Sequence, residues 1–184
     1  MGQVHGRVEQ SLKILCYPNE ILRRQAEKVT AFDASLRETA RQMLAVMDEA
    51  KGVGLAANQV GLAIRLCVFR VPESPGNDIA MVNPEIVERL GSDSSEEGCL
   101  SFPGIFIDVA RATQLKVRYQ DLEGQEHTAE VAGLMARAVQ HEIDHLDGVL
   151  LVDKMNAVQR VAKRGALRML EARQERSQAA EGTP

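Results

Sequence analysis

The stretch VQHEIDHLDG (residues 139–148) holds two of the chain's four histidines, four positions apart, with Glu142 directly after the first. Residues four apart lie on one face of an α-helix, one turn from each other. We therefore expect His141 and His145 to bind one metal ion together, and Glu142 to act as general base on a metal-bound water. This H-E-x-x-H pattern predicts metal-assisted hydrolysis. The alternative is a solvated helix face with two incidental histidines.

The pattern does not supply the third metal ligand. A metzincin would carry histidine at position 151, where this chain has Leu, so that class of protease is excluded. Cys67, in the apolar run LCVF, is expected to be a core residue, and so is Cys16. Cys99 lies in the polar segment EEGCLS, where a metal would hold its thiolate deprotonated. The candidates left open are Cys99, the other cysteines, Asp153, Glu171, His5 and His127.

The segment GVGLAANQVG (52–61) is a Gly- and Ala-rich loop whose backbone can come close to a ligand. It lacks the third glycine of a dinucleotide-binding fingerprint and the Gly-Lys-Ser/Thr of a phosphate loop. Gln59, near its end, either braces the loop or donates its amide to the oxyanion of a tetrahedral intermediate.

Helical patterns occupy both ends of the chain and strand patterns its middle. Helices are expected over 35–51, capped by Asp33 or Ser35, over 134–146, stopped by Gly148, and over 156–174. Strands are expected over 65–71, over 79–90 with a break at Pro84, and in a hairpin over 114–131; residues 71–78 and 91–104 are expected to be loops.

These elements predict an α+β fold with antiparallel or mixed β-sheets around a central helix that carries the H-E-x-x-H pattern, followed by a C-terminal helix. Residues 1–184 are expected to form a single domain, with a flexible N-terminal extension (1–11) and tail (176–184). Aromatic residues make up only 3% of the chain, so aliphatic side chains must fill the core.

The composition limits where the protein can act. No apolar run approaches the roughly 20 residues of a membrane span, and the N-terminus lacks the apolar region of a signal peptide. Three widely spaced cysteines do not form a disulfide framework. A net charge of −4 argues against a general nucleic-acid surface. The protein is therefore expected in the cytoplasm, with no membrane and no DNA partner.

Three stretches, GVGLAANQ (52–59), EGCLS (97–101) and QHEIDH (140–145), resemble the signature motifs of the peptide deformylases in order and spacing. The resemblance covers roughly residues 12–155. It implies hydrolytic removal of the formyl group, as formate, from the formyl-methionine that begins newly made polypeptides. The residues by themselves predict only amide hydrolysis on a metal.

The resemblance implies a role for each matching residue. Cys99, His141 and His145 would bind the metal, with water in the fourth position. Glu142 would be the general base and then pass its proton to the leaving amine. The catalytic side chain of Gln59 and the backbone N–H of Leu100 would hold the oxyanion. The expected metal is Fe²⁺, with Zn²⁺, Ni²⁺ or Co²⁺ able to substitute.

The same resemblance implies how the substrate is held. Backbone near Val53, Gly54 and Gly98 would pair with an extended peptide as an added strand. Val53, Leu134 and Ala138 would line the pocket for the methionine side chain. Glu97 and Arg111 are expected to form an ion pair that braces the cysteine loop. The direction of the Arg137 side chain and the role of Phe106 stay open, as they set fine substrate preference.

The expected partners are N-formylmethionyl nascent peptides, met by a monomer in a bacterial cytoplasm. The segment VQRVAKRGALRMLEARQER (158–176) is rich in Arg and Lys, which suits docking on the ribosome, although an amphipathic helix with a solvated charged face is an equal alternative. Two other functions remain as alternatives. A metallopeptidase would cleave unblocked peptide bonds, and a purely structural metal site would be closed by four protein ligands.

Overall fold

The computed structural model describes residues 12–71 and 78–181, with side chains described up to residue 176. Its helices are α1 (Ala34–Glu49), α2 (Gly133–Leu146) and α3 (Ala157–Glu181), with short 3₁₀ turns η1 (Glu20–Arg23), η2 (Ala57–Val60) and η3 (Leu151–Lys154). Its strands are β1 (Gly54–Ala56), β2 (Leu66–Phe69), β3 (Ile79–Leu90), β4 (Asp93–Gly98), β5 (Phe106–Arg111), β6 (Gln114–Gln120) and β7 (Glu126–Ala132).

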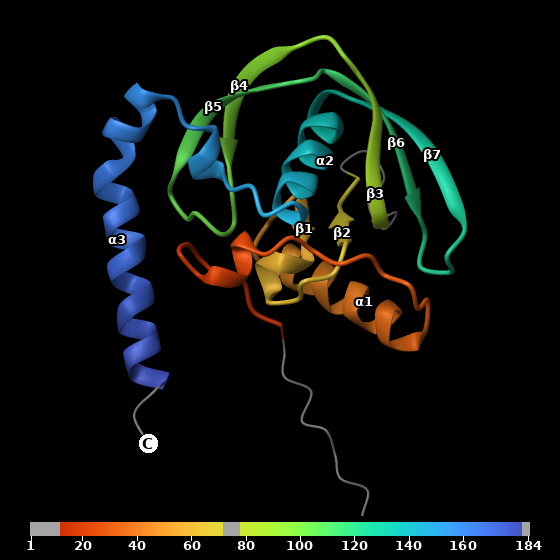
Figure 1. Cartoon of the computed structure of the whole chain (residues 1–184), viewed down its shortest axis with the longest axis horizontal. Helices are drawn as coiled ribbons and strands as arrows, with labels where there is room; N and C mark the ends of the chain where they lie inside the picture. The colour runs from red at the N-terminus through yellow and green to blue at the C-terminus, as the bar shows by residue number, and fades with distance from the viewer. Residues whose placement is uncertain (1–11, 72–77, 182–184) are drawn as a thin grey trace, which may run out of the picture.

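The strands form two antiparallel sheets that enclose α2. One sheet has the order β1-β2-β3-β6-β7, and the other is the hairpin β4-β5. Figure 1 shows α2 in the middle of the molecule, with β4 and β5 on one side and β3, β6 and β7 on the other, while α1 lies below. The expected α+β class, with a central helix between sheets and a C-terminal helix, is confirmed.

Helix α1 forms where its cap and its apolar spacing predict it. The Asp33 carboxylate accepts hydrogen bonds from the backbone N–H groups of Ser35 and Leu36, both at 3.0 Å, and so satisfies two donors that the helix leaves free. The apolar side chains recur at helical spacing and are buried against β1 and β2: Leu36, Ala40, Met43 and Met47.

Helix α2 begins and ends at glycines with left-handed backbone, Gly133 (φ +57°) and Gly148 (φ +75°). The predicted stop at Gly148 is confirmed, and its N–H donates to the carbonyl of His145 at 3.0 Å. One face of α2 is apolar and packs on the larger sheet through Ala136, Val139, Ile143 and Leu146. The two histidines lie off this face, on the side of α2 that remains free for the site.

The expectation that residues 91–104 form a loop is wrong for its first half. Residues Asp93–Gly98 form β4, paired along its length with β5. The run DSSEEG has few strand-forming residues, so local propensity favours a loop. Strand formation is instead decided by the partner strand β5, in which buried and exposed residues alternate. Its buried residues Ile107, Val109 and Arg111 hold the hairpin on the protein.

The break expected at Pro84 is a bulge rather than an end. Strand β3 runs from Ile79 to Leu90, and its register with β6 shifts between Val82 and Glu85. Proline has no N–H to give to a strand pair, so it fits where the pairing is already interrupted. The hairpin expected over 114–131 is confirmed as β6-β7.

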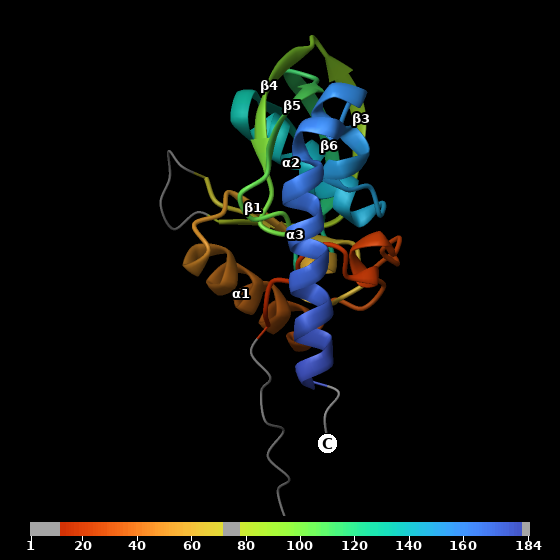
Figure 2. The same cartoon turned by 90° about the vertical axis from the view of Figure 1, so that its left-hand side faces the viewer.

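Helix α3 runs past the expected end at residue 174, to Glu181, on the outside of the molecule (Figures 1 and 2). It is held by Leu170, with Ala166 and Leu167, against a core cluster that includes Phe102 and Ile105. Of the helices in the described ranges, none combines the length and the apolar composition that a membrane span needs.

Candidate active site and metal centre

Three candidate ligands come together from two elements. Cys99 directly follows β4, whereas His141 and His145 lie one turn apart on α2. Each offers one ligand atom, and the three atoms lie within 4.8 Å of one another. The Sγ atom of Cys99 is 3.2 Å from Nε2 of His145. Among the candidates that the sequence left open, Cys99 is therefore the one that joins the histidine pair.

The other candidate ligands that the structure describes are engaged elsewhere. His127 contacts the Asp121 carboxylate at 2.7 Å on the β6-β7 hairpin. Asp153 pairs with Arg23, and Glu171 accepts the hydroxyl of Tyr17.

The other two cysteines are expected to be core residues, and both are at least partly buried. Cys67 is fully buried in the core under α2. Cys16 is half-buried, and its burial raises the pKa of its thiol. His5 lies outside the described residues.

The donor set fits a divalent transition metal. Nδ1 of His141 lies 3.2 Å from Oε2 of Glu97, so Nε2 is the nitrogen left for a metal. One sulfur and two imidazole nitrogens suit zinc or iron. Oε2 of Glu142 is buried and has no hydrogen-bond partner among the described residues. A buried carboxylate oxygen without a partner costs free energy, so the site is shaped for something that the protein itself does not supply.

The electrostatics differ between the two histidines. For His141, burial lowers the pKa, but the Cys99 thiol and the Glu97 carboxylate outweigh it and raise the pKa well above its usual value. For His145, burial and the nearby His141 hold the pKa well below its usual value. Neutral imidazole is the form that binds metals, and His145 is held in that form.

Glu142 is held against the backbone of β1. The residue is 4% exposed. Burial raises the pKa of its carboxyl to about 7, against the lowering effect of His141 and of the Ala56 backbone. A carboxyl whose pKa lies near neutrality suits a general base. A methyl group built on Gly54 would lie 2.7 Å from Oε1 of Glu142, so only glycine leaves room for this carboxylate.

Replacing Gly54 by Ala is therefore expected to displace the Glu142 carboxylate and lower turnover. A displacement near 1 Å costs on the order of 100-fold in rate. Turnover measured at equal metal content checks this. Gly165→Ala is the matched control, because a methyl group there meets no atom within 4 Å. If both variants turned over like the parent, Gly54 would not be needed to seat Glu142.

Gln59 is oriented by its own loop. Its Oε1 accepts the N–H of Ala56 at 2.9 Å, which leaves Nε2 directed away from the loop. Nε2 lies 3.6 Å from Sγ of Cys99 and 3.2 Å from Oγ of Ser101. The Gln59 side chain braces the loop and also points its amide donor toward Cys99. The two interpretations of Gln59, a loop brace and an oxyanion donor, are therefore compatible. Leu100 lies directly after Cys99.

Glu97 receives four hydrogen bonds. Its Oε1 accepts Nε of Arg111 at 2.9 Å and Nη1 of Arg137 at 2.8 Å. Its Oε2 accepts Nη2 of Arg111 at 3.0 Å and faces Nδ1 of His141. Burial raises the pKa of Glu97, but these partners outweigh it and hold the pKa at about 2. The expected ion pair of Glu97 and Arg111 is present and buried.

Two residues left open by the sequence have defined positions. Arg137 turns toward Glu97 and the β4-β5 hairpin rather than into solvent. Phe106 is 49% exposed, and its ring covers Gly98, where a methyl group would lie 2.6 Å from it. Asp144, three residues after His141 and directly before His145, contacts Arg111 and Lys154.

A cavity of about 540 Å³ opens onto Cys99, His141 and Glu142. All five residues expected to hold substrate line it: Val53, Gly54, Gly98, Leu134 and Ala138. Among the described strands, β1 is an edge of the larger sheet, and β4 has β5 as its one partner. Each of these strands thus presents an edge that an extended peptide can join. Sequence reasoning missed Lys51, Glu96 and Pro103, which also line the cavity and lie beside the motifs.

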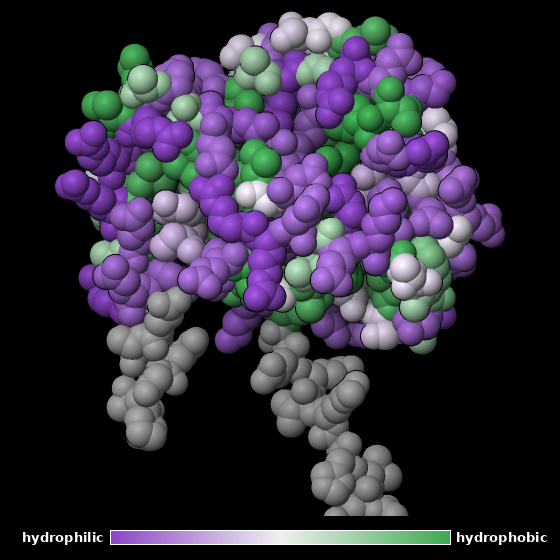
Figure 3. Space-filling view, viewed as in Figure 1, coloured by the Kyte–Doolittle hydropathy of each residue, from purple (hydrophilic) through white to green (hydrophobic). Residues whose placement is uncertain are grey.

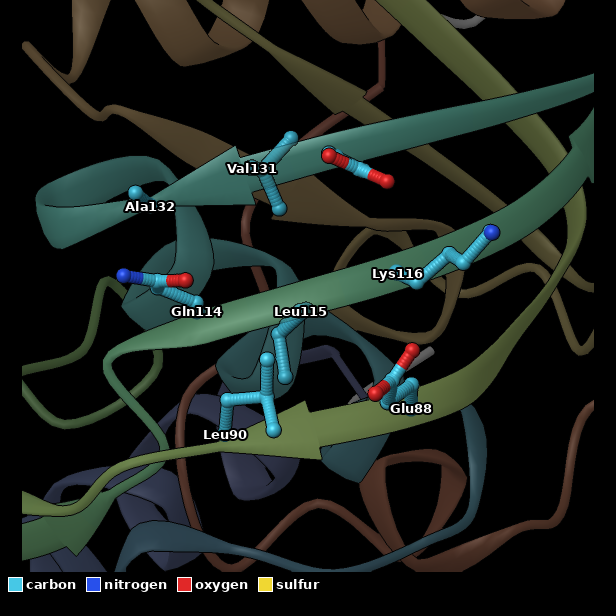
Figure 4. A pocket seen from close by; sticks show the side chains of 8 residues that line it. Glu88, Leu90, Gln114, Leu115, Lys116, Val131 and Ala132 are labelled. Carbon is cyan, nitrogen blue, oxygen red and sulfur yellow. The ribbon is translucent and has the colours of Figure 1, made fainter.

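A second hollow lies at the ends of β3, β6 and β7, away from the cluster (Figure 4). Its volume is about 350 Å³. Its charged side chains include Glu88 and Lys116, and its lining holds neither histidine nor cysteine. It therefore offers no thiol and no imidazole for a metal of the kind that the cluster suits.

Comparison with known proteins agrees with the geometry. Residues 11–161 match the family model for polypeptide deformylase. A peptide deformylase of Opitutus terrae is 45% identical over 83% of this chain and 88% of its own length.

Solved structures agree as well. A peptide deformylase from Legionella pneumophila is 41% identical, with a TM-score of 0.83 over 90% of this chain and 98% of its own. The plant peptide deformylase PDF1B is 38% identical, with a TM-score of 0.88 over 94% of this chain and 95% of its own. On these matches, over most of its length, the chain belongs to the polypeptide deformylase family.

Proposed function

We propose that the buried Glu142 carboxylate, set beside the cluster of Cys99, His141 and His145, is the catalytic centre of this peptide deformylase. As a member of the family, the protein removes the formyl group from the N-terminus of newly made polypeptides. The observation that carries the assignment of the centre is the position of Glu142: it is buried, lies on Gly54, and has one oxygen without a partner among the described residues.

Cys99, His141 and His145 would hold one divalent metal ion. Fe²⁺ is the metal that we propose, with Zn²⁺, Ni²⁺ or Co²⁺ as substitutes. When bound, the ion supplies Lewis-acid chemistry and lowers the pKa of water in its open position. The Cys99 thiolate supports a divalent ion at this site. Its negative charge offsets part of the charge of the ion, which three neutral ligands would not do.

The side chains of this protein then move the protons. Glu142 takes a proton from the water that attacks the formyl carbon, and later gives it to the amine as the C–N bond breaks and formate leaves. The Nε2 donor of Gln59 and the backbone N–H of Leu100 hold the negative charge that develops on the formyl oxygen. The bond from Ala56 to Gln59 supports this role, because it fixes the amide before substrate arrives.

The peptide would bind as an extended strand between the edges of β1 and β4. Backbone at Val53, Gly54 and Gly98 would pair with it. The methionine side chain would enter the cavity beside Leu134 and Ala138. The apolar part of this lining supports a preference for methionine at the first position.

Substrate discrimination tests the proposal. The protein is given formyl-Met-Ala-Ser, acetyl-Met-Ala-Ser and unblocked Met-Ala-Ser at equal concentration, and formate, acetate and free amino acids are measured. We expect formate from the first and little product from the others, since the extra methyl group of acetate must fit beside the metal ligands. Cleavage of the unblocked peptide in preference to the formylated one would identify a metallopeptidase instead.

Arg111→Ala is expected to weaken both the metal site and the fold. It leaves the buried Glu97 without its bidentate partner, and breaking a buried pair costs about 3–5 kcal/mol. Loss of a residue that supports a metal ligand lowers metal affinity or activity by about 10- to 100-fold. Metal content after dialysis and turnover check this, with the exposed Arg118→Ala as control. Unchanged metal content and unchanged turnover would show that the Glu97–Arg111 pair does not support the metal site.

We further propose that the chain acts as a single-domain monomer in the cytoplasm, where formylated chains are made. The site supports the single domain, because strands of both sheets and helix α2 line one cavity together.

We also propose that α3 contacts the ribosome. It carries exposed Arg160, Arg164 and Arg168 at spacings of four, which places them on one face of the helix. In Figure 3 the surface over α3 is mostly hydrophilic. Co-sedimentation with ribosomes at low salt, lost at high salt and lost in an Arg164→Glu, Arg168→Glu variant, is the expected result. Absence of binding at low salt would reject the contact.

A further inference from the structure

Arg137 is the one Arg or Lys on α2, and the catalytic scheme gives it no role. It lies one turn before His141 on the same helix. Its Nη1 donates to Oε1 of Glu97 and to the carbonyl of Val109, both at 2.8 Å. Its Nη2 donates to the carbonyl of Asp93 at 3.1 Å. The guanidinium therefore binds the hairpin at three places: the start of β4, the end of β4 and the middle of β5.

The hairpin and the helix carry different parts of the proposed metal site. Cys99 follows the last residue of β4, and both histidines belong to α2. The distance between sulfur and nitrogen donors thus depends on how α2 sits against the hairpin. A contact that joins these two elements sets the geometry of the site without touching it.

A second contact joins the same two elements on the other side of His141. Arg111, the last residue of β5, donates to the carboxylate of Asp144 on α2. Asp144 lies three residues after His141, and Arg137 lies four residues before it. Residues at these spacings lie along one side of the helix, so the two contacts flank His141. Glu97 links them, because it accepts from Arg111, Arg137 and His141 together.

We propose that Arg137 is a positioning residue: with the Arg111–Asp144 contact it clamps α2 to the β4-β5 hairpin, and so sets the spacing between Cys99 and the two histidines. This inference rests on the proposed metal site. It differs from the Glu97–Arg111 pair, because Arg137 acts on two backbone carbonyls as well as on a carboxylate.

A role for Arg137 in binding a substrate carboxylate fits the contacts less well. Its side chain is 13% exposed although it lines the cavity. Both terminal nitrogens already donate to acceptors of the hairpin. Arg137 lines the cavity together with Leu134 and Ala138, and with its guanidinium held by the hairpin, the alkyl stem is the part of the side chain left to contact a ligand there.

The test compares Arg137→Met, Arg137→Lys and the control Arg118→Met in protein loaded with Co²⁺ under anaerobic conditions. Methionine keeps most of the apolar stem and removes the donors. Lysine keeps one charge that reaches Glu97 but loses the fork that also reaches the backbone. Arg118 forms an exposed ion pair with Glu85 on the other sheet, and such pairs contribute little. The readouts are the rate of Co²⁺ release to a chelator and the sulfur-to-cobalt absorption band.

We expect Arg137→Met to release Co²⁺ about 10-fold faster than the parent, in the range found for residues that support metal ligands, and to shift the absorption band. The Co²⁺ release rate of Arg137→Lys is expected to lie between those of the parent and Arg137→Met. Arg118→Met is expected to release Co²⁺ at the parent's rate. A parent-like release rate and band in Arg137→Met would overturn the clamp, and so would a parent-like Arg137→Lys if the methionine variant failed to fold.

Formate release by the parent separates this inference from the proposed function. A parent that binds Co²⁺ but releases no formate would contradict the proposed function, while a faster Co²⁺ release in Arg137→Met would still support the clamp. A variant that loses turnover but keeps the parent's release rate and band would contradict the clamp alone.

Discussion

Glu142→Ala is expected to lower the turnover number at least about 100-fold, and up to about 10,000-fold, the range that a positioned general base contributes. The physical reason is the place of the carboxylate. Glu142 is 4% exposed, its carboxylate lies against the Gly54 backbone, and one of its oxygens has no partner among the described residues. Removing it leaves no other carboxylate in that position to take the proton of the attacking water.

Two controls separate chemistry from structure in this experiment. Glu142→Gln keeps the size of the side chain and removes the basic oxygen, so it is expected to lose turnover to a similar degree. Glu85→Gln changes an exposed carboxylate on β3 and is expected to have no effect. Metal per protein is measured in each variant. If Glu142→Gln held its metal and kept more than about a tenth of the parent's turnover, Glu142 would not be the general base.

Cys99→Ala is expected to abolish stable metal binding and, with it, turnover. Cys99 is the only sulfur among the three gathered donors, and its Sγ lies 3.2 Å from Nε2 of His145. Two imidazoles alone leave a divalent ion with too few protein ligands for a site of this kind. After dialysis against a chelator and reloading, we expect near-stoichiometric metal in the parent and little in the variant.

Cys16→Ala is the matched control for the loss of a thiol. Cys16 is half-buried and precedes η1 in the chain. Burial and the nearby Cys99 raise the pKa of the Cys16 thiol, so this control shows which of two neighbouring thiols holds the metal. Its replacement is expected to leave metal content and turnover unchanged. A Cys99→Ala protein that retained one metal per chain after dialysis would show that another residue supplies the third ligand.

The sequence predicts best where one local rule decides the structure. Asp33 caps α1 as its side chain allows, and Gly148 ends α2 in the left-handed region that glycine favours. The i, i+4 spacing of His141 and His145 places both on one side of α2 by helix geometry alone.

Prediction fails where distant residues decide. Residues 93–98 have a loop-like composition, yet they form β4 because β5 pairs with them. Pro84 interrupts the pairing of β3 without ending the strand, since a bulge absorbs it. In both cases the deciding contact is made by a partner strand that local sequence does not describe.

The same limit holds for the site. The gathering of Cys99 with the histidines brings together residues more than forty positions apart, which spacing along the chain cannot show. The sequence leaves the direction of the Arg137 side chain open, because a side chain one turn before His141 can face either the cavity or solvent. Its direction follows from three acceptors on a hairpin that composition did not predict.

The most direct test of the central claim is formate release from formyl-Met-Ala-Ser, measured with protein that was purified without oxygen and loaded with Fe²⁺. We expect formate in proportion to bound metal, none after the metal is removed, recovery on reloading, and loss of formate in Glu142→Gln at equal metal content. Fully loaded protein that releases no formate, or metal-free protein that releases it at the same rate, would contradict the account.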